Sequence, residues 1–371
     1  MRVLQINSVC GIRSTGRICT EIAKELEDQG AEVKIAYGRL DQVPPDMEKY
    51  AVRIGNDRDL KCHGLATRLL DAHGFWSRRA TKQFLKWADS YDPDLLWLHN
   101  IHGYYINVEM LFRWIKSRPK MQVKWTLHDC WAFTGHCSHF DYVGCQKWKK
   151  GCHHCSQKKT YPTSLGLDNS RKNYLRKKAA FTGVKNLTII TPSQWLADLV
   201  KQSFLGVYPV EVRKNHIDLD VFKPTFGQFR EKHGLENTKL ILGVASAWSE
   251  RKGLYDFYKL SEHLTTDAKV VLVGLDEDQM KDLPVQILGI SRTNNAQELA
   301  EIYTTADVFF NPTYEDTYPT VNLEAQACET KVVAYDTGGC AETLYREDAK
   351  LIAQGDWKTC LEIVNNLKLS K

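Results

Sequence analysis

Short apolar runs separated by segments of helical pattern extend along the whole chain. The first run, Val3-Leu4-Gln5-Ile6, is followed by a loop with Gly11 and Gly16, and then by a helical segment that ends near Gly30. Further apolar runs lie at residues 33–37, 94–99, 122–127 and 187–191. Strands that alternate with helices in this way predict parallel sheets covered by helices.

The same pattern starts again in the second half of the chain. New apolar runs lie at residues 240–245, 269–274, 307–310 and 331–335. Pro209 and Pro224 enclose a polar stretch between the two series, and a length of 371 residues suits two domains of ordinary size. We therefore expect an α/β protein with two Rossmann-like domains, residues 1–205 and 206–371, that face a central cleft.

Charge is distributed unevenly between the two halves. Residues 1–200 carry 31 Lys and Arg against 19 Asp and Glu, a balance of +12, whereas residues 201–371 carry 19 against 26, a balance of −7. A basic half indicates an anionic partner, which could be a phosphorylated substrate, an anionic membrane surface or nucleic acid. The alternative is an incidental basic face in contact with solvent.

Two further features bear on where the chain works. No stretch approaches the roughly 18 consecutive apolar residues of a membrane span, and the N-terminal run lacks the long apolar core of a signal peptide. The eleven cysteines are an odd number, which argues against a disulfide framework in a chain without an export signal. We expect a cytoplasmic protein, with peripheral contact to the inner face of the membrane as an option.

Four cysteines lie within nineteen residues and form a Cys-rich insertion near 137–155. Cys137, Cys145, Cys152 and Cys155 follow the pattern Cys-x7-Cys-x6-Cys-x2-Cys. Four thiolates can close a tetrahedral zinc site, and the last pair has the spacing of a zinc knuckle. The open alternatives are reduced thiols packed in the interior and a redox function.

A candidate phosphate site follows the run at 307–310. Pro319 suits the start of a helix, and the first amides of that helix would point out of its N-terminus, where free donors and the dipole attract phosphate. Acidic groups on either side, Asp316 and Glu324, could bind sugar hydroxyls or could merely stabilise the helix start. The amides concerned are those of Thr320, Val321 and Asn322.

A second candidate segment is the loop Trp248-Ser249-Glu250-Arg251-Lys252-Gly253, which follows the first strand of the second series. In open α/β sheets, ligands bind outside the carboxyl ends of the strands. Arg251 and Lys252 are therefore expected to face the same phosphate site.

These two segments, together with Thr337-Gly338-Gly339 downstream, resemble glycosyltransferase family 4. The segments at 126–135 and 190–196 are similar to the subgroup that builds capsular and colanic-acid-type polysaccharides. The resemblance implies the GT-B fold. It also implies transfer of a sugar from a nucleotide diphosphate donor with retention of anomeric configuration, in which the leaving phosphate helps to deprotonate the acceptor.

The resemblance assigns roles to residues of the second half. Lys252 would neutralise the donor diphosphate, with Arg251 as a helper, and Glu324 would hold the ribose. The first acid of the family's acidic pair falls on Asp316 instead of the usual Glu, so Glu315 could share the contact to the transferred sugar. An arginine that the family usually carries is replaced here by Ser246, which leaves more of the phosphate charge to Arg251 and Lys252.

Two residues of the first half receive roles in the same way. His128 would contact the transferred sugar near its reacting carbon, although a lone histidine is often structural. Gly16 would let donor or acceptor approach the backbone, although a glycine there could simply make a turn.

The sequence as a whole therefore predicts a retaining glycosyltransferase of hexosyltransferase type. It would use a UDP- or GDP-sugar and a lipid-linked glycan acceptor in surface-polysaccharide assembly, without a catalytic metal and without nucleic acid. The basic run 171–178 would contact an anionic membrane surface or would be an ordinary solvated helix face. The alternatives are a sugar-nucleotide epimerase of the same fold and a zinc-dependent nucleic-acid-binding protein.

Overall fold

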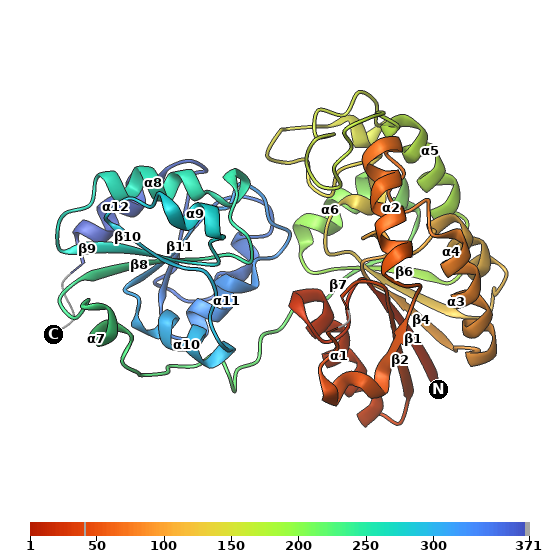
Figure 1. The fold of residues 1–371 in the computed structure, drawn as a ribbon, viewed down its shortest axis with the longest axis horizontal. Coiled ribbons are helices and arrows are strands. Elements are labelled where there is room, and N and C mark those ends of the chain that lie inside the picture. Colours follow the sequence, from red (N-terminus) through yellow and green to blue (C-terminus); the bar gives the residue numbers. More distant parts are fainter. Residues whose placement is uncertain (41, 368–371) are drawn as a thin grey trace. The chain divides into compact units, whose positions relative to one another are not determined.

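The computed structural model describes residues 1–40 and 42–367, and the chain divides into two compact units (Figure 1). The first unit comprises Met1–Arg213 and the second begins at Lys214. The sequence placed the boundary after residue 205, ahead of the short strand β7 (Val210–Val212). That strand pairs with β6 (Leu187–Thr191) and so belongs to the first sheet.

The first unit contains a seven-stranded parallel sheet in the order β3-β2-β1-β4-β5-β6-β7. Strand β1 (Arg2–Asn7) lies between β2 and β4, with Val3 in register with Val33 and Leu95. The other strands are β2 (Glu32–Tyr37), β3 (Ala51–Arg53), β4 (Leu95–Leu98) and β5 (Gln122–Thr126). The helices are α1 (Arg13–Asp28), α2 (Asp57–Leu70), α3 (Arg78–Tyr91), α4 (Val108–Lys116), α5 (Ser170–Phe181) and α6 (Gln194–Gln202).

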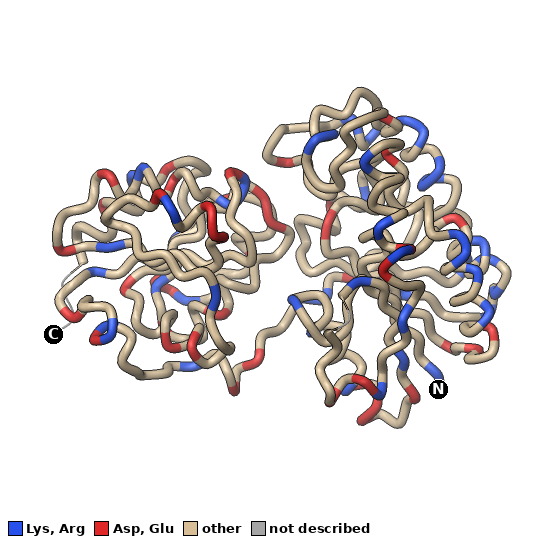
Figure 2. The backbone as a smooth tube through the Cα atoms, in the orientation of Figure 1, with Lys and Arg blue, Asp and Glu red and all other residues tan. Residues whose placement is uncertain are grey.

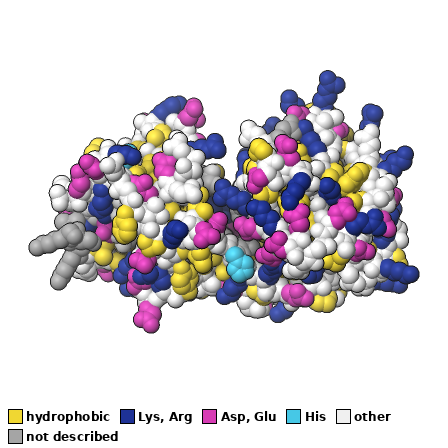
Figure 3. Space-filling view, turned by 90° about the horizontal axis from the view of Figure 1, so that it is seen from below, with side chains coloured by type: hydrophobic (Ala, Val, Ile, Leu, Met, Phe, Trp, Pro, Cys, Tyr) yellow, Lys and Arg dark blue, Asp and Glu magenta, His cyan; other side chains and the backbone are white. Residues whose placement is uncertain are grey.

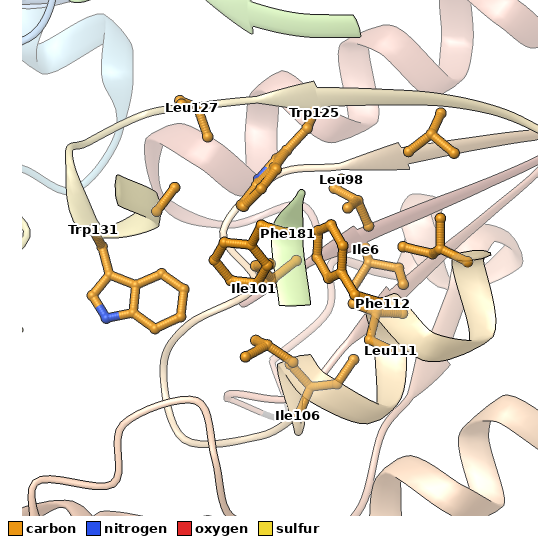
Figure 4. Close-up of a cluster of buried hydrophobic side chains, with 14 of the residues drawn as sticks. Ile6, Leu98, Ile101, Ile106, Leu111, Phe112, Trp125, Leu127, Trp131 and Phe181 are labelled. Atoms are coloured by element: carbon orange, nitrogen blue, oxygen red, sulfur yellow. The ribbon is translucent and has the colours of Figure 1, made fainter. Parts of the chain in front are cut away.

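Alternate residues of these strands bury two separate cores, because successive side chains of a strand point to opposite faces. Val3 and its neighbours pack against α1 on one face. Leu4 and Ile6 pack on the other face with α3, α4, α5 and α6, in a cluster rich in aromatic rings. In this cluster Phe112 and Trp125 contact Phe181 at centroid distances of 4.5 and 5.0 Å (Figure 4). The sheet is thus covered on both faces, as expected for a parallel sheet.

The second unit contains a six-stranded parallel sheet in the order β10-β9-β8-β11-β12-β13. Its strands are β8 (Lys239–Val244), β9 (Ala268–Val273), β10 (Ile287–Ile290), β11 (Val308–Asn311), β12 (Lys331–Tyr335) and β13 (Lys350–Ile352). Its helices are α7 (Phe229–His233), α8 (Leu254–Glu262), α9 (Glu277–Lys281), α10 (Ala296–Thr305), α11 (Thr320–Ala327) and α12 (Trp357–Asn365). Helices α8 and α12 cover one face of the sheet, and α10 and α11 cover the other.

The α/β class and the two parallel sheets confirm the predicted fold class. One expectation about the first turn is wrong, because Gly16 lies inside α1 and not in the loop before it. Among the described helices, none combines the length and the apolar character needed to cross a bilayer.

Candidate functional site

The residues predicted to bind the donor come from two neighbouring strands of the second sheet. β8 and β11 are paired in parallel, so the segments that follow them leave the sheet at the same edge. The turn Glu250–Lys252 follows β8, and the segment 312–319 follows β11. The backbone amide of Tyr314 donates a hydrogen bond of 2.9 Å to the carbonyl of Arg251, which joins the two segments directly.

Arg251 holds the second segment through its side chain. Its guanidinium donates to the carbonyl of Glu315 at 3.0 Å, and its Nε lies 3.6 Å from Glu315 Oε1. The Glu315 side chain is 2% exposed. In this geometry Glu315 is therefore an internal partner of Arg251, with little surface to offer to a ligand.

Lys252 and Asp316 form the more accessible ion pair of the site. Lys252 Nζ lies 2.5 Å from Asp316 Oδ2, and the two side chains are 24% and 21% exposed. The other carboxylate oxygen of Asp316 accepts from the backbone amide of Tyr318 at 3.1 Å, which fixes its orientation. Of the two adjacent acids, Asp316 is thus the more exposed.

Gly253 and Gly338 let their two segments pack closely against the segment 312–319. Gly253 has φ of +78°, and a Cβ there would lie 2.2 Å from the carbonyl oxygen of Pro312. Gly338 has φ of +55°, and a Cβ there would lie 2.0 Å from the carbonyl oxygen of Asp316. The amide of Gly339 donates to that same oxygen at 3.0 Å. The three segments interlock through contacts that no other residue type could make.

The start of α11 agrees only partly with the prediction. The helix begins at Thr320, directly after Pro319. The amide of Asn322, predicted to be a phosphate donor, instead donates to the carbonyl of Pro319 at 3.2 Å. The Asn322 side chain is fully buried and bonds to Asn311 and Thr343. Asn322 therefore secures the helix start, and Thr320 and Val321 stay as the predicted donors.

Glu324 lies one turn further along α11. Its Oε2 accepts a hydrogen bond of 3.0 Å from the hydroxyl of Tyr303 on α10. Burial, reinforced by the Glu324 charge, raises the pKa of Tyr303, so the phenol stays a neutral donor. Tyr303 thereby orients the carboxylate that was predicted to hold the ribose.

His128 lies in the first unit, just beyond the carboxyl end of β5. Its Nε2 is 3.2 Å from Nδ1 of His99, and the two rings are stacked. His99 is held in turn by the side-chain oxygen of Gln5 at 3.0 Å. Burial lowers the pKa of His128 to about 4, so its imidazole is neutral at pH 7.

Next to His128 lies a contact between a carboxylate and an imidazole that the sequence analysis missed. Asp129 Oδ2 is 2.9 Å from Nε2 of His102. Burial alone would raise the pKa of Asp129, but the charge and the hydrogen bond of His102 hold that pKa below its usual range. Nδ1 of His102 lies 3.3 Å from the hydroxyl of Tyr161. The only signal in the sequence was an Asp directly after a His at a strand end.

Gly16 has a structural role in the first unit. A Cβ at this position would lie 3.1 Å from Cγ2 of Val9 and 3.2 Å from the amide nitrogen of Gly11. Its small size thus lets α1 pack against the loop that precedes it. The predicted approach of a ligand to Gly16 stays a prediction.

The four clustered cysteines come together in space. Cys137, Cys145, Cys152 and Cys155 line one small cavity with the ring of Trp148. They are free thiols. A hydrogen bond from Cys137 lowers the pKa of Cys155 to about 7. Within residues 1–40 and 42–367, no three His, Cys, Asp or Glu side chains are arranged to hold a metal ion, so the zinc site stays a prediction.

The basic run 171–178 was predicted to be either a membrane contact or an ordinary solvated helix face, and one of its cations fits neither, because it is buried. Lys177 is buried, donates to the carbonyl of Trp131 at 2.7 Å and lies over the Trp131 ring. Arg176 makes a two-pronged ion pair with Glu109, at 2.8 and 2.6 Å. Helical periodicity places Lys177 on the inward face of α5, where its charge is unavailable to a membrane.

Comparison with protein families identifies both halves of the chain. Residues 15–221 match the model described as Glycosyltransferase Family 4, and residues 226–370 match the one described as Glycosyl transferases group 1. The chain belongs to glycosyltransferase family 4. This confirms the resemblance stated from the sequence, and the chain is accordingly a glycosyltransferase.

The names of curated relatives agree with this assignment. A glycosyl transferase of Escherichia coli K12 named for colanic acid biosynthesis, WcaC, is 24% identical over 301 residues, which cover 75% of this chain and 67% of WcaC. The N,N'-diacetylbacillosaminyl-diphospho-undecaprenol α-1,3-N-acetylgalactosaminyltransferase of Campylobacter jejuni is 26% identical over 138 residues, 34% of this chain and 36% of that enzyme. Among curated relatives, the match thus often spans half of their length or less.

A solved structure supports the fold over almost the whole chain. Anabaena HepE in complex with UDP superimposes with a TM-score of 0.64 at 15% sequence identity and covers 98% of this chain and 89% of HepE. At that identity the likeness shows the fold, which is GT-B.

Proposed function

We propose that this glycosyltransferase moves a hexose from a UDP-sugar to a lipid-linked glycan acceptor during assembly of a surface polysaccharide. The observation that carries the proposal is the ion pair Lys252–Asp316 at the edge where β8 and β11 end. It offers a cation for a diphosphate and a carboxylate for sugar hydroxyls within one small region. HepE, which has the same fold, was solved with UDP, and this favours uridine over guanosine.

The chemistry asks the protein mainly for positioning and for stabilisation of charge. As the sugar leaves the donor, negative charge grows on the β-phosphate. Lys252 is proposed to meet that charge, with Arg251 and the first amides of α11 beside it. Because a cation contributes more as charge develops, loss of Lys252 should reduce turnover by about 10²-fold or more.

Glu324 and Asp316 are proposed to bind hydroxyl groups. Glu324, oriented by Tyr303, would accept hydrogen bonds from the ribose. Asp316 would accept them from the transferred sugar, since Glu315 is buried against Arg251. The neutral imidazole of His128, which lies in the first unit, is proposed to hydrogen-bond a sugar hydroxyl.

Retention of configuration is proposed with a front-side displacement. The acceptor hydroxyl attacks on the face that the leaving group occupies, and its proton passes to the departing β-phosphate. The acceptor is proposed to be carried on a lipid diphosphate, because the C. jejuni relative is named for such a substrate and WcaC for polysaccharide biosynthesis.

The first test is the donor. Purified protein is heated with UDP, GDP, ADP and their sugars, and a ligand at a hundred times its Kd should stabilise it by about 2.7 kcal/mol. Stabilisation by UDP compounds is expected, whereas a response confined to GDP or ADP compounds would contradict the proposed base.

The second test is the reaction. Incubation of the preferred UDP-sugar with undecaprenyl-diphosphate-linked saccharides should yield UDP and an extended glycan whose anomeric centre, read by NMR, matches the donor. Conversion of the donor to its epimer without an acceptor would replace the transferase proposal with an epimerase. An inverted product would refute the retaining mechanism.

A further inference from the structure

The first unit carries a group of exposed leucines at the C-terminal end of α2. Leu65 and Leu69 lie one turn apart on the helix, and Leu165 and Leu167 lie in the loop beside it. All four are 52–68% exposed. We call these four side chains the leucine patch.

Backbone contacts hold the loop of Leu165 and Leu167 against the last turn of α2, where Leu69 lies. The amide of Leu165 donates to the carbonyl of Arg68 at 2.8 Å, and the amide of Leu167 donates to that of Leu69 at 3.1 Å. Between them, a Cβ on Gly166 would lie 2.3 Å from the carbonyl of Leu69. The loop backbone therefore sits directly on the last turn of α2, and its leucines extend the outer surface of the helix.

The amphipathic character of α2 is the reverse of that of an ordinary surface helix. Its buried positions are small or polar, namely His63, Ala66 and Thr67, while three of its leucines, Leu65, Leu69 and Leu70, are exposed. A surface helix normally buries its apolar stripe. Figure 3 shows one face of the molecule, on which hydrophobic side chains are interspersed with charged ones, as on an ordinary protein surface. A cluster of exposed apolar side chains indicates an interaction site.

Cations surround the patch. Arg58, Lys61 and Arg68 are exposed and recur along α2 at helical spacing. Figure 2 shows that Lys and Arg are spread over many elements of the first unit. In the described part of the chain, none of the three forms an ion pair with an acid. Lys158 reaches the loop itself, where its ammonium donates to the carbonyl of Gly166 at 2.9 Å.

The start of α5 extends this basic rim. The side chain of Asn169 donates to the carbonyl of Leu70 at 2.7 Å, which fixes α5 to the end of α2. Arg171 and Lys172, in the first turn of α5, are exposed. The nearby acid, Asp168, accepts from the amides of Cys155 and Ser170, so its carboxylate is already bound within the protein.

We propose that the leucine patch and its basic rim dock the enzyme on an anionic lipid bilayer. Leucines would enter the boundary between headgroups and acyl chains, and the cations would contact lipid phosphates, as in interfacial helices. A second copy of the chain fits less well, because a basic rim would meet an identical basic rim. The inference deepens the proposed function, since a lipid-linked acceptor lies in a membrane.

The test is binding of the full chain to vesicles, by sedimentation. Wild type should bind phosphatidylcholine vesicles that contain phosphatidylglycerol, and should bind pure phosphatidylcholine far less. Binding should fall sharply at about 1 M salt, where charges are screened within about 3 Å. Equal binding to both vesicles, or none to either, would overturn the proposal.

Variants locate the surface. Leu65→Gln with Leu69→Gln should weaken binding at least about tenfold, and Arg58→Glu, Lys61→Glu and Arg68→Glu together should weaken it by about 10²-fold. The matched control is a triple Glu substitution on α3 at three of its exposed cations, Arg79, Lys82 and Lys86. Control variants that lose as much affinity would overturn the assignment to α2.

Two readouts separate this proposal from its alternatives. Stabilisation by UDP, measured on the same variants, should be unchanged, because the substitutions lie in the first unit and the donor residues in the second. A donor that fails to bind to wild type would refute the proposed function alone. Sedimentation equilibrium should show the same mass for wild type and leucine variants, and a dimer lost on Leu65→Gln would replace the membrane with a second copy.

Discussion

Replacement of Asp316 by Asn should have opposite effects on donor binding and on catalysis. Without a ligand, Lys252 is engaged by Asp316 at 2.5 Å. A diphosphate that binds Lys252 must loosen or share this bond. Asp316→Asn removes the competing charge, so UDP should bind more tightly, while turnover should fall because the transferred sugar loses a carboxylate partner.

The magnitude follows from the exposure of the pair. Fully exposed ion pairs contribute about 0–1 kcal/mol, and hydrogen bonds to charged groups about 1.5–3 kcal/mol. With side chains 24% and 21% exposed, the Lys252–Asp316 pair falls between these classes, at about 1–2 kcal/mol. UDP should therefore bind about 5- to 30-fold more tightly to the variant.

Isothermal titration with UDP measures this directly. Asp348→Asn is the matched control, since Asp348 pairs with Arg346 elsewhere in the second unit, and it should leave the Kd unchanged. Lys252→Ala should weaken UDP binding. If Asp316→Asn also weakens it while the fold stays intact, Asp316 orients Lys252 for the phosphates instead of competing with them, and the reasoning fails.

Three further predictions concern other residues. Glu324→Gln should weaken binding of UDP about tenfold or more, through loss of charge-assisted bonds, with less effect on the 2′,3′-dideoxy analogue. Tyr303→Phe, which only frees the carboxylate, should have a smaller effect. If Glu324→Gln weakens binding of UDP and of the dideoxy analogue equally, Glu324 does not contact the ribose. Metal analysis should find about one zinc per chain. The double variant Cys152→Ser/Cys155→Ser should lose this zinc along with stability of the first unit. Wild-type protein that is purified without chelators and contains no zinc would exclude the site. The pKa of His128 is about 4 in the folded chain and about 6.5 in the unfolded chain. Between pH 4 and about 6.5 the unfolded state therefore binds more protons than the folded state, so the free energy of unfolding rises with pH across this range. His128→Asn should flatten the rise by at most about 3 kcal/mol in urea unfolding between pH 4 and 7, and an unchanged pH dependence would count against burial of its neutral form.

Much of the fold could be predicted because buried parallel strands leave a clear signal. Runs such as 331–335 are continuous and apolar, and the observed strand has the same bounds. The four edge strands β3, β7, β10 and β13 escaped notice because each has only three or four residues. The start of α1 was misplaced for a different reason: its N-cap residue, Ile12, makes no side-chain cap, so the sequence lacks the usual signal.

The candidate site was predictable as a set of segments but not as a set of contacts. Strand order brings residues near 251 and 316 to one edge, yet nothing local says which acid each cation chooses. Arg251 pairs with Glu315, and Lys252 pairs with Asp316. The two cations are neighbours in sequence, and so are the two acids, so the sequence alone does not decide between the possible pairings. For Lys177 the signal was present, because Tyr174 and Phe181 mark the same helix face as apolar.

The close contacts of Gly253 and Gly338 determine which segments must be exchanged together in any attempt to alter donor preference. A segment transplanted from a relative must carry a backbone that accepts Gly253 against residue 312 and Gly338 against residue 316. If only 312–319 were exchanged, the carbonyl groups of residues 312 and 316 could shift, while Gly253 and Gly338, which pack against them, would stay unchanged. A viable chimera therefore has to import three discontinuous stretches, at 249–253, 312–319 and 336–339, and its crossover points belong within the strands that precede them.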